Sequence, residues 1–164
     1  MIKCFIIAAE TADGFIAKDK THAAFWTSKE DKARFVELTK KAGVVVMGSQ
    51  TFKTLPRALK ERRNIVYSRS QVFEDAEMTT ESPIALLDRL ESEEVKEVAI
   101  CGGSDIYTMF AKAGLVDTIY LTVEPILFGS GIKMFNEDLN LQLKTISEEK
   151  TPTGTILLEY RVLR

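Results

Sequence analysis

Short runs of Val and Ile recur along this 164-residue chain, and they constrain its fold more than any other feature. Several of them lack the alternation of polar and apolar residues that a strand shows when only one face is buried. Five such runs are Ile2–Ala9, Val44–Gly48, Asn64–Ser68, Val98–Cys101 and Thr118–Val123. Helical patterns separate them, so strand and helix alternate. This order predicts an α/β fold with a mostly parallel sheet.

The C-terminal third departs from this alternation. Two apolar segments, Leu143–Ser147 and Thr155–Leu163, flank the polar segment Glu148–Gly154, which contains Pro and Gly. This pattern predicts an antiparallel hairpin at one edge of the sheet. The longest other polar connection, Arg69–Glu81, is expected to be a surface loop. Because no repeat or linker interrupts the chain, residues 1–164 are expected to form one domain.

The composition excludes several classes of partner and site. Twenty-two basic residues against 24 acidic ones leave a formal net charge of −2, which does not indicate binding to nucleic acid or to an anionic membrane. The only histidine, His22, and the two cysteines, Cys4 and Cys101, lack metal-ligand spacing, so no metal site is expected. The apolar start of the chain is too short for a signal peptide or a membrane span. We expect a cytoplasmic protein with a small-molecule partner.

The first helix is predicted over Lys29–Lys41 and ends before Gly43, a residue type favoured after a helix. Thr27 and Glu30 have the spacing of a capping box. The neighbouring Ser28 can also cap the helix. The helix therefore begins within Thr27–Glu30, and its first turn is rich in polar side chains.

Asp31 heads the buried stripe of this helix, since it shares a face with three apolar residues, Phe35, Leu38 and Ala42. Arg34 lies off this stripe and is expected on the solvated side. An acid in the first turn also interacts favourably with the helix dipole, by about 0.3 to 1 kcal/mol. On an apolar face, however, a carboxylate must be protonated or have a polar partner. A ligand is one candidate for that partner.

Two predicted strands run into a glycine turn and then a helix, at Val44–Thr51 and at Val98–Asp105. Glycine lets a ligand approach the main chain, and a helix N-terminus favours a phosphate. The alternative is that each glycine only permits a tight turn. Neither turn matches a Rossmann or Walker motif. Tyr107 lies off the apolar stripe of the second helix, so it faces either a ligand cleft or solvent.

Ordered motifs over nearly the whole chain resemble dihydrofolate reductase. They are Trp26, Asp31, Phe35 and Thr39; Val46–Gly48 and Thr51–Phe52; Arg57, Leu59, Arg62, Asn64–Ile65 and Ser68; Ile100, Gly102–Gly103 and Tyr107; and Tyr120–Thr122. No single motif is decisive, but their order and separations are specific. The resemblance implies one α/β domain whose mostly parallel sheet has about eight strands, an antiparallel C-terminal hairpin strand and about four flanking helices.

The resemblance also implies an activity, the NADPH-dependent reduction of 7,8-dihydrofolate to 5,6,7,8-tetrahydrofolate by hydride transfer to the pterin. Asp31 would bind the amidine edge of the pterin and support protonation of N5, Thr122 would hydrogen-bond this carboxylate, and Trp26 would hold a water near the ring. Arg62 would bind the α-carboxylate of the glutamate tail. The other implied substrate-binding residues are Ile7, Ala8, Phe35, Leu55 and Leu59.

NADPH would lie with its pyrophosphate between the helix starts after Gly48 and Gly103. The implied cofactor-binding residues are Ala9, Ile16, Gly48, Ser49, Gln50, Thr51, Ser68, Arg69, Gly102, Gly103, Ser104, Asp105, Ile106 and Tyr107. Ser49 and Asp105 stand where the family often has a basic residue, which weakens binding of the 2′-phosphate. Arg69 matches a basic position that some members use for this phosphate. NADPH is therefore expected over NADH.

A second resemblance, to the reductase domain of riboflavin biosynthesis, rests on Ala12–Ala17, Trp26–Ser28 and Leu127–Gly131. It implies NADPH-dependent reduction of a ribosylaminopyrimidine phosphate, which needs a cationic pocket. Lys32 and Arg34 are candidates for that pocket. A nucleotide-binding module without turnover is a third alternative. The sequence leaves open whether the protein is a monomer or a homodimer.

Overall fold

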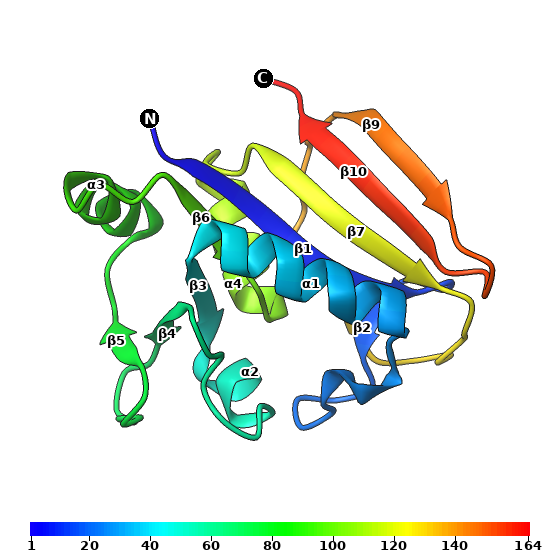
Figure 1. The fold of residues 1–164 in the computed structure, drawn as a ribbon, viewed down its shortest axis with the longest axis horizontal. Helices are drawn as coiled ribbons and strands as arrows, with labels where there is room; N and C mark the ends of the chain where they lie inside the picture. Colours follow the sequence, from blue (N-terminus) through cyan, green and yellow to red (C-terminus); the bar gives the residue numbers. More distant parts are fainter.

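Eight strands form the central sheet of the computed structural model, which describes residues 1–164 (Figure 1). They are β1 (Lys3–Thr11), β3 (Val44–Gly48), β4 (Arg63–Tyr67), β5 (Glu77–Thr79), β6 (Glu97–Ile100), β7 (Thr118–Glu124), β9 (Leu143–Lys150) and β10 (Ile156–Val162). Their order is β5-β4-β3-β6-β1-β7-β10-β9. All neighbours up to β7 pair in parallel, whereas β10 and β9 pair antiparallel. The predicted fold class is confirmed.

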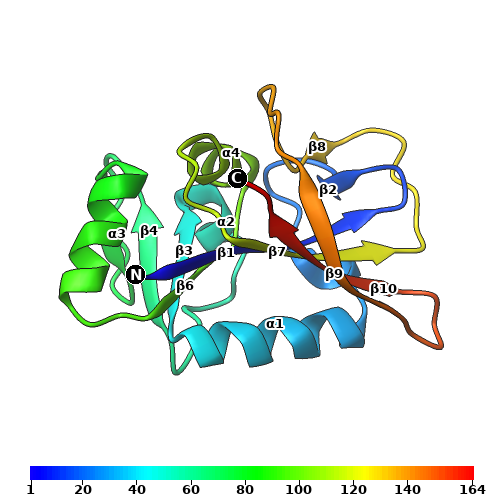
Figure 2. The ribbon, with the colours of Figure 1, turned by 90° about the horizontal axis from the view of Figure 1, so that it is seen from above.

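Helices cover both faces of the sheet. The helix α1 (Lys29–Ala42) lies on one face, and α3 (Pro83–Ser92) and α4 (Ser104–Lys112) lie on the other (Figure 2). The short helix α2 (Ser49–Lys53) follows β3 directly. A second, two-stranded sheet joins β2 (Phe15–Ala17) to β8 (Ile132–Lys133). No helix combines the length and the apolar character that crossing a bilayer requires.

The central strands β1 and β3 are largely apolar because each face of the sheet has its own core. Cys4, Ile6 and Ala8 of β1 contribute to the core under α3 and α4. The intervening residues Phe5 and Ile7 contribute to the core on the α1 side. Since successive side chains of a strand point to opposite faces, a strand buried on both sides needs apolar residues at every position. This is the physical basis of the Val and Ile runs in the sequence.

The helix α1 begins one residue later than a capping box at Thr27 requires. Ser28 is its N-cap, and the Ser28 Oγ accepts a hydrogen bond from the Asp31 N–H at 3.1 Å. The Thr27 hydroxyl instead donates to the Ala24 carbonyl of the preceding 3₁₀ turn, so the Thr27 capping box is wrong. The helix ends at Gly43, whose φ of 78° is the left-handed conformation that glycine favours.

The segment Arg69–Glu81 is not a loop throughout, because its last part forms β5 at the edge of the sheet. Glu77 of β5 pairs with Arg63 of β4, which ties the edge strand to its neighbour. With three residues, β5 is too short to produce a recognisable apolar pattern.

The helix α3 offers a matched test of the core on its face. Leu86 is fully buried, whereas Ile84 on the same helix is 55% exposed. We expect Leu86→Ala to lower the free energy of unfolding by about 2–5 kcal/mol, because it leaves a cavity. Ile84→Ala should change it by no more than about 0.5 kcal/mol. Urea titration of both variants measures this difference, and equal losses would contradict the packing described.

Candidate active site

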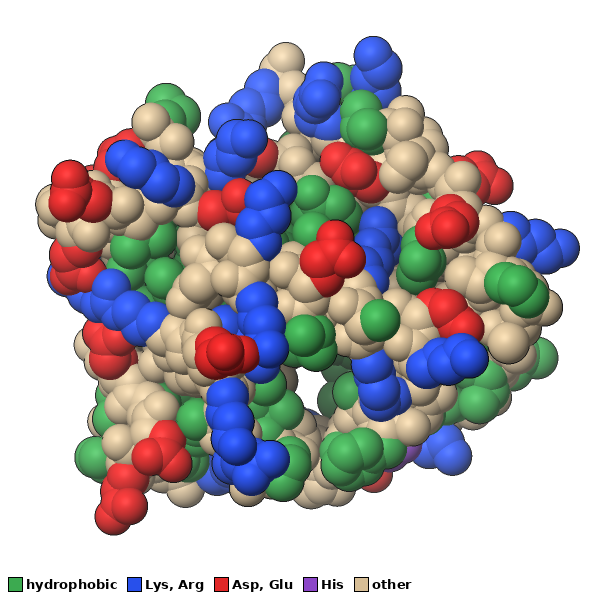
Figure 3. Space-filling model, viewed as in Figure 1, with side chains coloured by type: hydrophobic (Ala, Val, Ile, Leu, Met, Phe, Trp, Pro, Cys, Tyr) green, Lys and Arg blue, Asp and Glu red, His purple; other side chains and the backbone are tan.

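A cavity of about 900 Å³ opens at the carboxyl ends of the central parallel strands. In Figure 3, which has the same view as Figure 1, an opening is visible in the lower middle of the molecule. Most of the site residues expected from the sequence line this cavity, namely Ile7–Ala9, Ile16, Trp26, Asp31, Phe35, Gly48–Thr51 and Gly102–Tyr107. The crevice beyond the strand ends is where open α/β sheets bind their ligands. The fold thus brings together residues that are far apart in sequence.

Asp31 lines this cavity with a carboxylate that has no ion pair. Burial raises the pKa of Asp31 above its ordinary value, and the nearby hydroxyls of Thr122 and Thr27 only partly offset this effect. The charge of Glu124 raises the pKa further, whereas Lys32 lowers it. Desolvation disfavours the charged carboxylate, so a cationic or hydrogen-bond-donating ligand would stabilise it.

Tyr107 closes the floor of the cavity and does not face solvent. It is 4% exposed, and its hydroxyl donates a hydrogen bond of 2.7 Å to the main-chain oxygen of Ile7. Burial raises the pKa of this phenol well above its ordinary value, so it stays a donor. The off-stripe position of Tyr107 in the sequence is therefore explained by a contact between α4 and β1.

The two glycine turns meet at the centre of the cavity, where the N–H of Gly48 donates to the carbonyl of Gly102 at 2.8 Å. A Cβ at Gly103 would lie 3.2 Å from the Thr51 hydroxyl, and one at Gly48 would lie 3.3 Å from an Ile106 side-chain carbon. Gly102 has a φ of 123°, which other residues rarely adopt. Glycine thus keeps the main chain of both turns open to a ligand.

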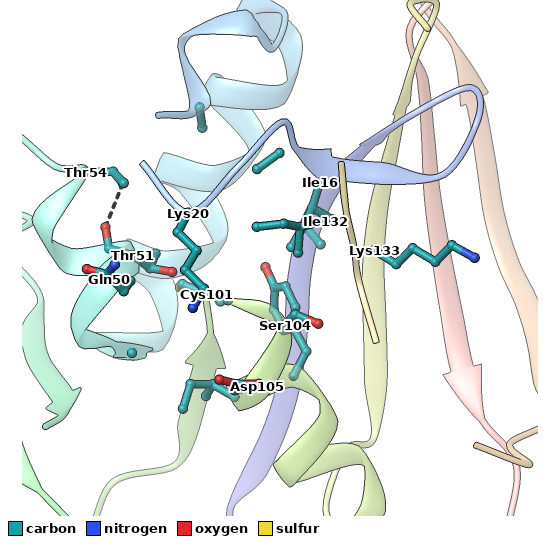
Figure 4. A pocket seen from close by; sticks show the side chains of 18 of the residues that line it. Ile16, Lys20, Gln50, Thr51, Thr54, Cys101, Ser104, Asp105, Ile132 and Lys133 are labelled. Carbon is teal, nitrogen blue, oxygen red and sulfur yellow. Dashed lines mark hydrogen bonds between the residues drawn. The ribbon is translucent and has the colours of Figure 1, made fainter. Parts of the chain in front are cut away.

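Three buried side-chain polar atoms have no hydrogen-bond partner, and all three belong to residues that line this cavity. They are Trp26 Nε1, Tyr67 Oη and Ser104 Oγ. Buried polar atoms are nearly always paired, so these atoms are suited to hydrogen-bonding a ligand or water. Lys20 points into the cavity, whereas Lys133 points away from it (Figure 4). These donors and the open glycine turns fit an anionic dinucleotide.

Asp105 is the least favourable residue for such an anion, because its carboxylate lies in the first turn of α4. It accepts a hydrogen bond from the Asn136 side chain. Asn136 belongs to the segment 132–138, which supplies a wall of the cavity that sequence reasoning missed. Tyr67 was missed as well. None of these residues belongs to a motif, so the sequence carried no signal for them.

Other expected site residues lie outside the cavity lining. Leu55 and Leu59 pack on the core of the α1 face, Thr122 is buried in β7, and Ser68 and the exposed Arg69 follow β4. Arg62 donates from Nη1 to the Thr39 hydroxyl and from Nε to the Lys60 carbonyl, both at 2.9 Å. These bonds fix the guanidinium group while leaving Nη2 without a protein partner.

The expectation that Arg34 is solvated is wrong. Arg34 is partly buried, and its Nη2 donates to the Leu158 carbonyl at 2.7 Å. Its guanidinium group also lies over the Tyr120 ring, 5.1 Å from the centroid. The cause is that β7 and β10 approach this side of α1, which helical periodicity alone does not reveal. Lys32 donates to the Thr27 carbonyl at 2.6 Å, so both candidate cations are bound to the protein itself.

Comparisons with known proteins relate the sequence to one family and the fold to a second group. The sequence profile of the dihydrofolate reductase family matches residues 3–150. The dihydrofolate reductase of Staphylococcus haemolyticus is 32% identical over 123 residues, which cover 74% of this chain and 69% of that protein.

Two solved structures share the fold. A putative riboflavin biosynthesis protein from Shewanella sp. PV-4 has a TM-score of 0.80 at 21% identity, covering 99% of this chain and all of that one. A Thermotoga maritima diaminohydroxyphosphoribosylaminopyrimidine deaminase/5-amino-6-(5-phosphoribosylamino)uracil reductase also has a TM-score of 0.80, at 20% identity. It covers 99% of this chain and 57% of that one. At these identities the likeness establishes the fold alone.

The partly buried carboxylate of Asp31 predicts a pH-dependent stability difference. Because the pKa of Asp31 is raised in the folded state, ionisation destabilises the fold as the pH rises through the folded pKa. We expect Asp31→Asn to raise the urea midpoint at pH 7 and to lose this gain below the unfolded pKa of about 3.9. Glu37→Gln, at an exposed position of the same helix, is the control. A larger gain in acid than at pH 7 would contradict the raised pKa.

Proposed function

The chain belongs to the dihydrofolate reductase family, and from this membership we propose that it is an oxidoreductase that reduces 7,8-dihydrofolate to 5,6,7,8-tetrahydrofolate with NADPH. One observation carries the proposal, namely that Asp31 presents an unpaired, partly buried carboxylate to a cavity large enough for a bicyclic ring and a nucleotide. Ligand pockets of about 300–1,000 Å³ accommodate molecules of this size.

Asp31 would bind the pterin by its amidine edge. An amidine presents two parallel N–H donors, which match the two oxygens of a carboxylate in a bidentate pair. The same contact would offset the desolvation of the Asp31 carboxylate. The bound substrate would therefore stabilise a charge that has no cationic partner in the free protein. Asp31 would also support protonation of N5, with Trp26 Nε1, unpartnered in the protein, holding a water nearby. Because this step needs a proton, turnover should fall on the alkaline side.

The proposed cofactor site lies on the other half of the cavity. Gly48 and Gly103 would admit the pyrophosphate, and Thr51 and Ser104 would donate hydrogen bonds to it. Lys20 supplies a positive charge on the same side. NADPH bound there supplies the hydride, and the protein contributes position and electrostatics. We propose NADPH over NADH on the family pattern, although Arg69 lies outside the cavity lining.

A riboflavin-type reaction is the second candidate, and the solved structures with this fold favour it. A uracil ring, however, presents its N3–H between two carbonyl oxygens and lacks the amidine. Those oxygens would face the Asp31 carboxylate. Their partial negative charge and the negative charge of the carboxylate would repel each other in a dry cleft. The Arg34 guanidinium group, which could have bound a substrate phosphate, is held by the Leu158 carbonyl and Tyr120. The edge of the uracil ring and the bonds that hold Arg34 therefore both favour a pterin as the substrate.

The proposal predicts which substrate is reduced. The purified protein should oxidise NADPH in the presence of dihydrofolate and not with 5-amino-6-(5-phosphoribosylamino)uracil, as followed by nicotinamide absorbance. Asp31→Asn should lower turnover by roughly 10² to 10⁴ while the protein stays folded.

The control is Glu37→Gln, which removes an exposed carboxylate from the same helix and should turn over normally. Reduction of the uracil alone would establish the second candidate. Turnover of neither compound would favour a nucleotide-binding module, and full activity of Asp31→Asn would remove this carboxylate from the mechanism.

Arg62 provides a separate test of the glutamate tail. Its Nη2 is free of protein partners while Thr39 and Lys60 orient the group. A charged hydrogen bond contributes about 1.5–3 kcal/mol, so Arg62→Ala should raise the KM for dihydrofolate about 10- to 100-fold and leave kcat nearly unchanged. Lys60→Ala, at an exposed neighbour, should leave KM unchanged. Steady-state kinetics measures both, and a loss confined to kcat would exclude the tail-binding role.

A further inference from the structure

Glu124 is a buried carboxylate that the proposed chemistry does not use. It is the last residue of β7 and is 3% exposed. One carboxylate oxygen accepts a hydrogen bond from the main-chain N–H of Ser28, and the other accepts one from the hydroxyl of Thr155. No Lys, Arg or His forms an ion pair with it.

A buried carboxylate without a cation is costly, so its surroundings must compensate for the charge. The compensating group here is the N-terminus of α1, since Ser28 is the N-cap of that helix. A helix N-terminus carries a partial positive charge and unpaired N–H groups. Glu124 therefore binds the start of α1 with both its charge and a hydrogen bond.

The contacts continue from Glu124 to the cavity. Ser28 donates its main-chain N–H to Glu124, and its hydroxyl oxygen accepts the N–H of Asp31. Thr155, in the segment just before β10, holds the other side of Glu124. The first turn of α1 is thus fastened to the end of β7 through one residue. Asp31 is three residues from that fastening point, on the face that lines the cavity.

We propose that Glu124 is a positioning residue, which fixes the first turn of α1 on β7 and thereby holds the Asp31 carboxylate at the cavity wall. The importance of this contact for catalysis rests on the function proposed for Asp31. The contact itself does not, because it can be measured without any substrate.

Glu124 also acts on Asp31 through its charge. It raises the pKa of Asp31, in addition to the larger effect of burial. The other charged or titratable groups that interact with Asp31 are Lys32 and Arg34 on α1 and Tyr107 on α4. Of these, Lys32 and Arg34 are cationic and oppose the effect of Glu124. Removing the charge of Glu124 should therefore lower the pKa of Asp31.

The test compares Glu124→Gln with the control Glu30→Gln. Glu30 lies in the first turn of α1, and its carboxylate does not hydrogen-bond Ser28. In Glu124→Gln, carboxyl NMR should show Asp31 titrating at lower pH than in the wild type. Hydrogen exchange of the Ser28 amide should accelerate about tenfold or more, because a hydrogen bond to a charged acceptor is weakened. Glu30→Gln should leave the Ser28 exchange rate unchanged. An unchanged Asp31 titration together with unchanged Ser28 exchange would overturn the proposal.

If Glu124→Gln does not fold, Thr155→Val tests the positioning role by weakening the hold on the other oxygen of Glu124. It removes one of the two hydrogen bonds that hold Glu124 and leaves α1 untouched. Ser28 exchange should again accelerate, and unchanged exchange would reject the positioning role. Both measurements use the protein without ligand. A chain that reduces neither substrate would disprove the proposed reaction while leaving the contact between Glu124 and α1 to be judged by these readouts.

Discussion

One buried and one half-buried carboxylate at the start of the same helix, neither with an ion pair, are the constraint on which the site depends. Glu124 and Asp31 both lie near the N-terminus of α1, whose field favours negative charge. The protein satisfies Glu124 with the Ser28 amide and the Thr155 hydroxyl. Asp31 keeps its charge turned to the cavity with only weak compensation. At this one end of α1 the protein supplies hydrogen-bond donors to Glu124, whereas the Asp31 carboxylate is open to a ligand.

The sheet determines where this helix end lies. The strand β6 lies between β3 and β1, so the glycine turns after β3 and β6 lie side by side at the carboxyl edge. The helix α1 crosses the opposite face from α4, and its N-terminus reaches the same edge near β7 (Figure 2). Tyr107 joins the two halves by donating to Ile7 at the bottom of the cavity. The two proposed halves of the cavity therefore share walls that β1 and α4 build, and Lys20 and the segment 135–138 add residues from outside the helices and strands.

The sequence predicted most of the sheet because burial on both faces leaves a strong signal, as in Val44–Gly48. It also singled out Asp31, which lines the cavity, since an acid at the head of an apolar stripe is conspicuous. Arg34 was misplaced because helical periodicity identifies a face but not which strands lie over it. The three-residue β5 carries too little pattern to be recognised. Glu124 was missed because an acid at the end of an apolar strand looks like the start of a loop until the beginning of α1 is placed beside it.

The charges around the cavity bear on how it would hold an anionic cofactor. The lining contains five carboxylates, Asp19, Asp31, Asp105, Glu137 and Asp138, against two lysines, Lys20 and Lys133. Glu137 pairs with Lys112, and Asp105 accepts from Asn136, so two of these charges are directed to the protein. With one lysine pointing inward, net charge cannot provide most of the attraction. Binding must then come from neutral donors, such as Ser104 and the main chain of the glycine turns, together with the N-terminal field of α4. Positions 49 and 105 hold Ser and Asp in place of a basic residue. Such a site does not require a basic residue there, since well-placed N–H and O–H groups bind a phosphate without an opposite charge.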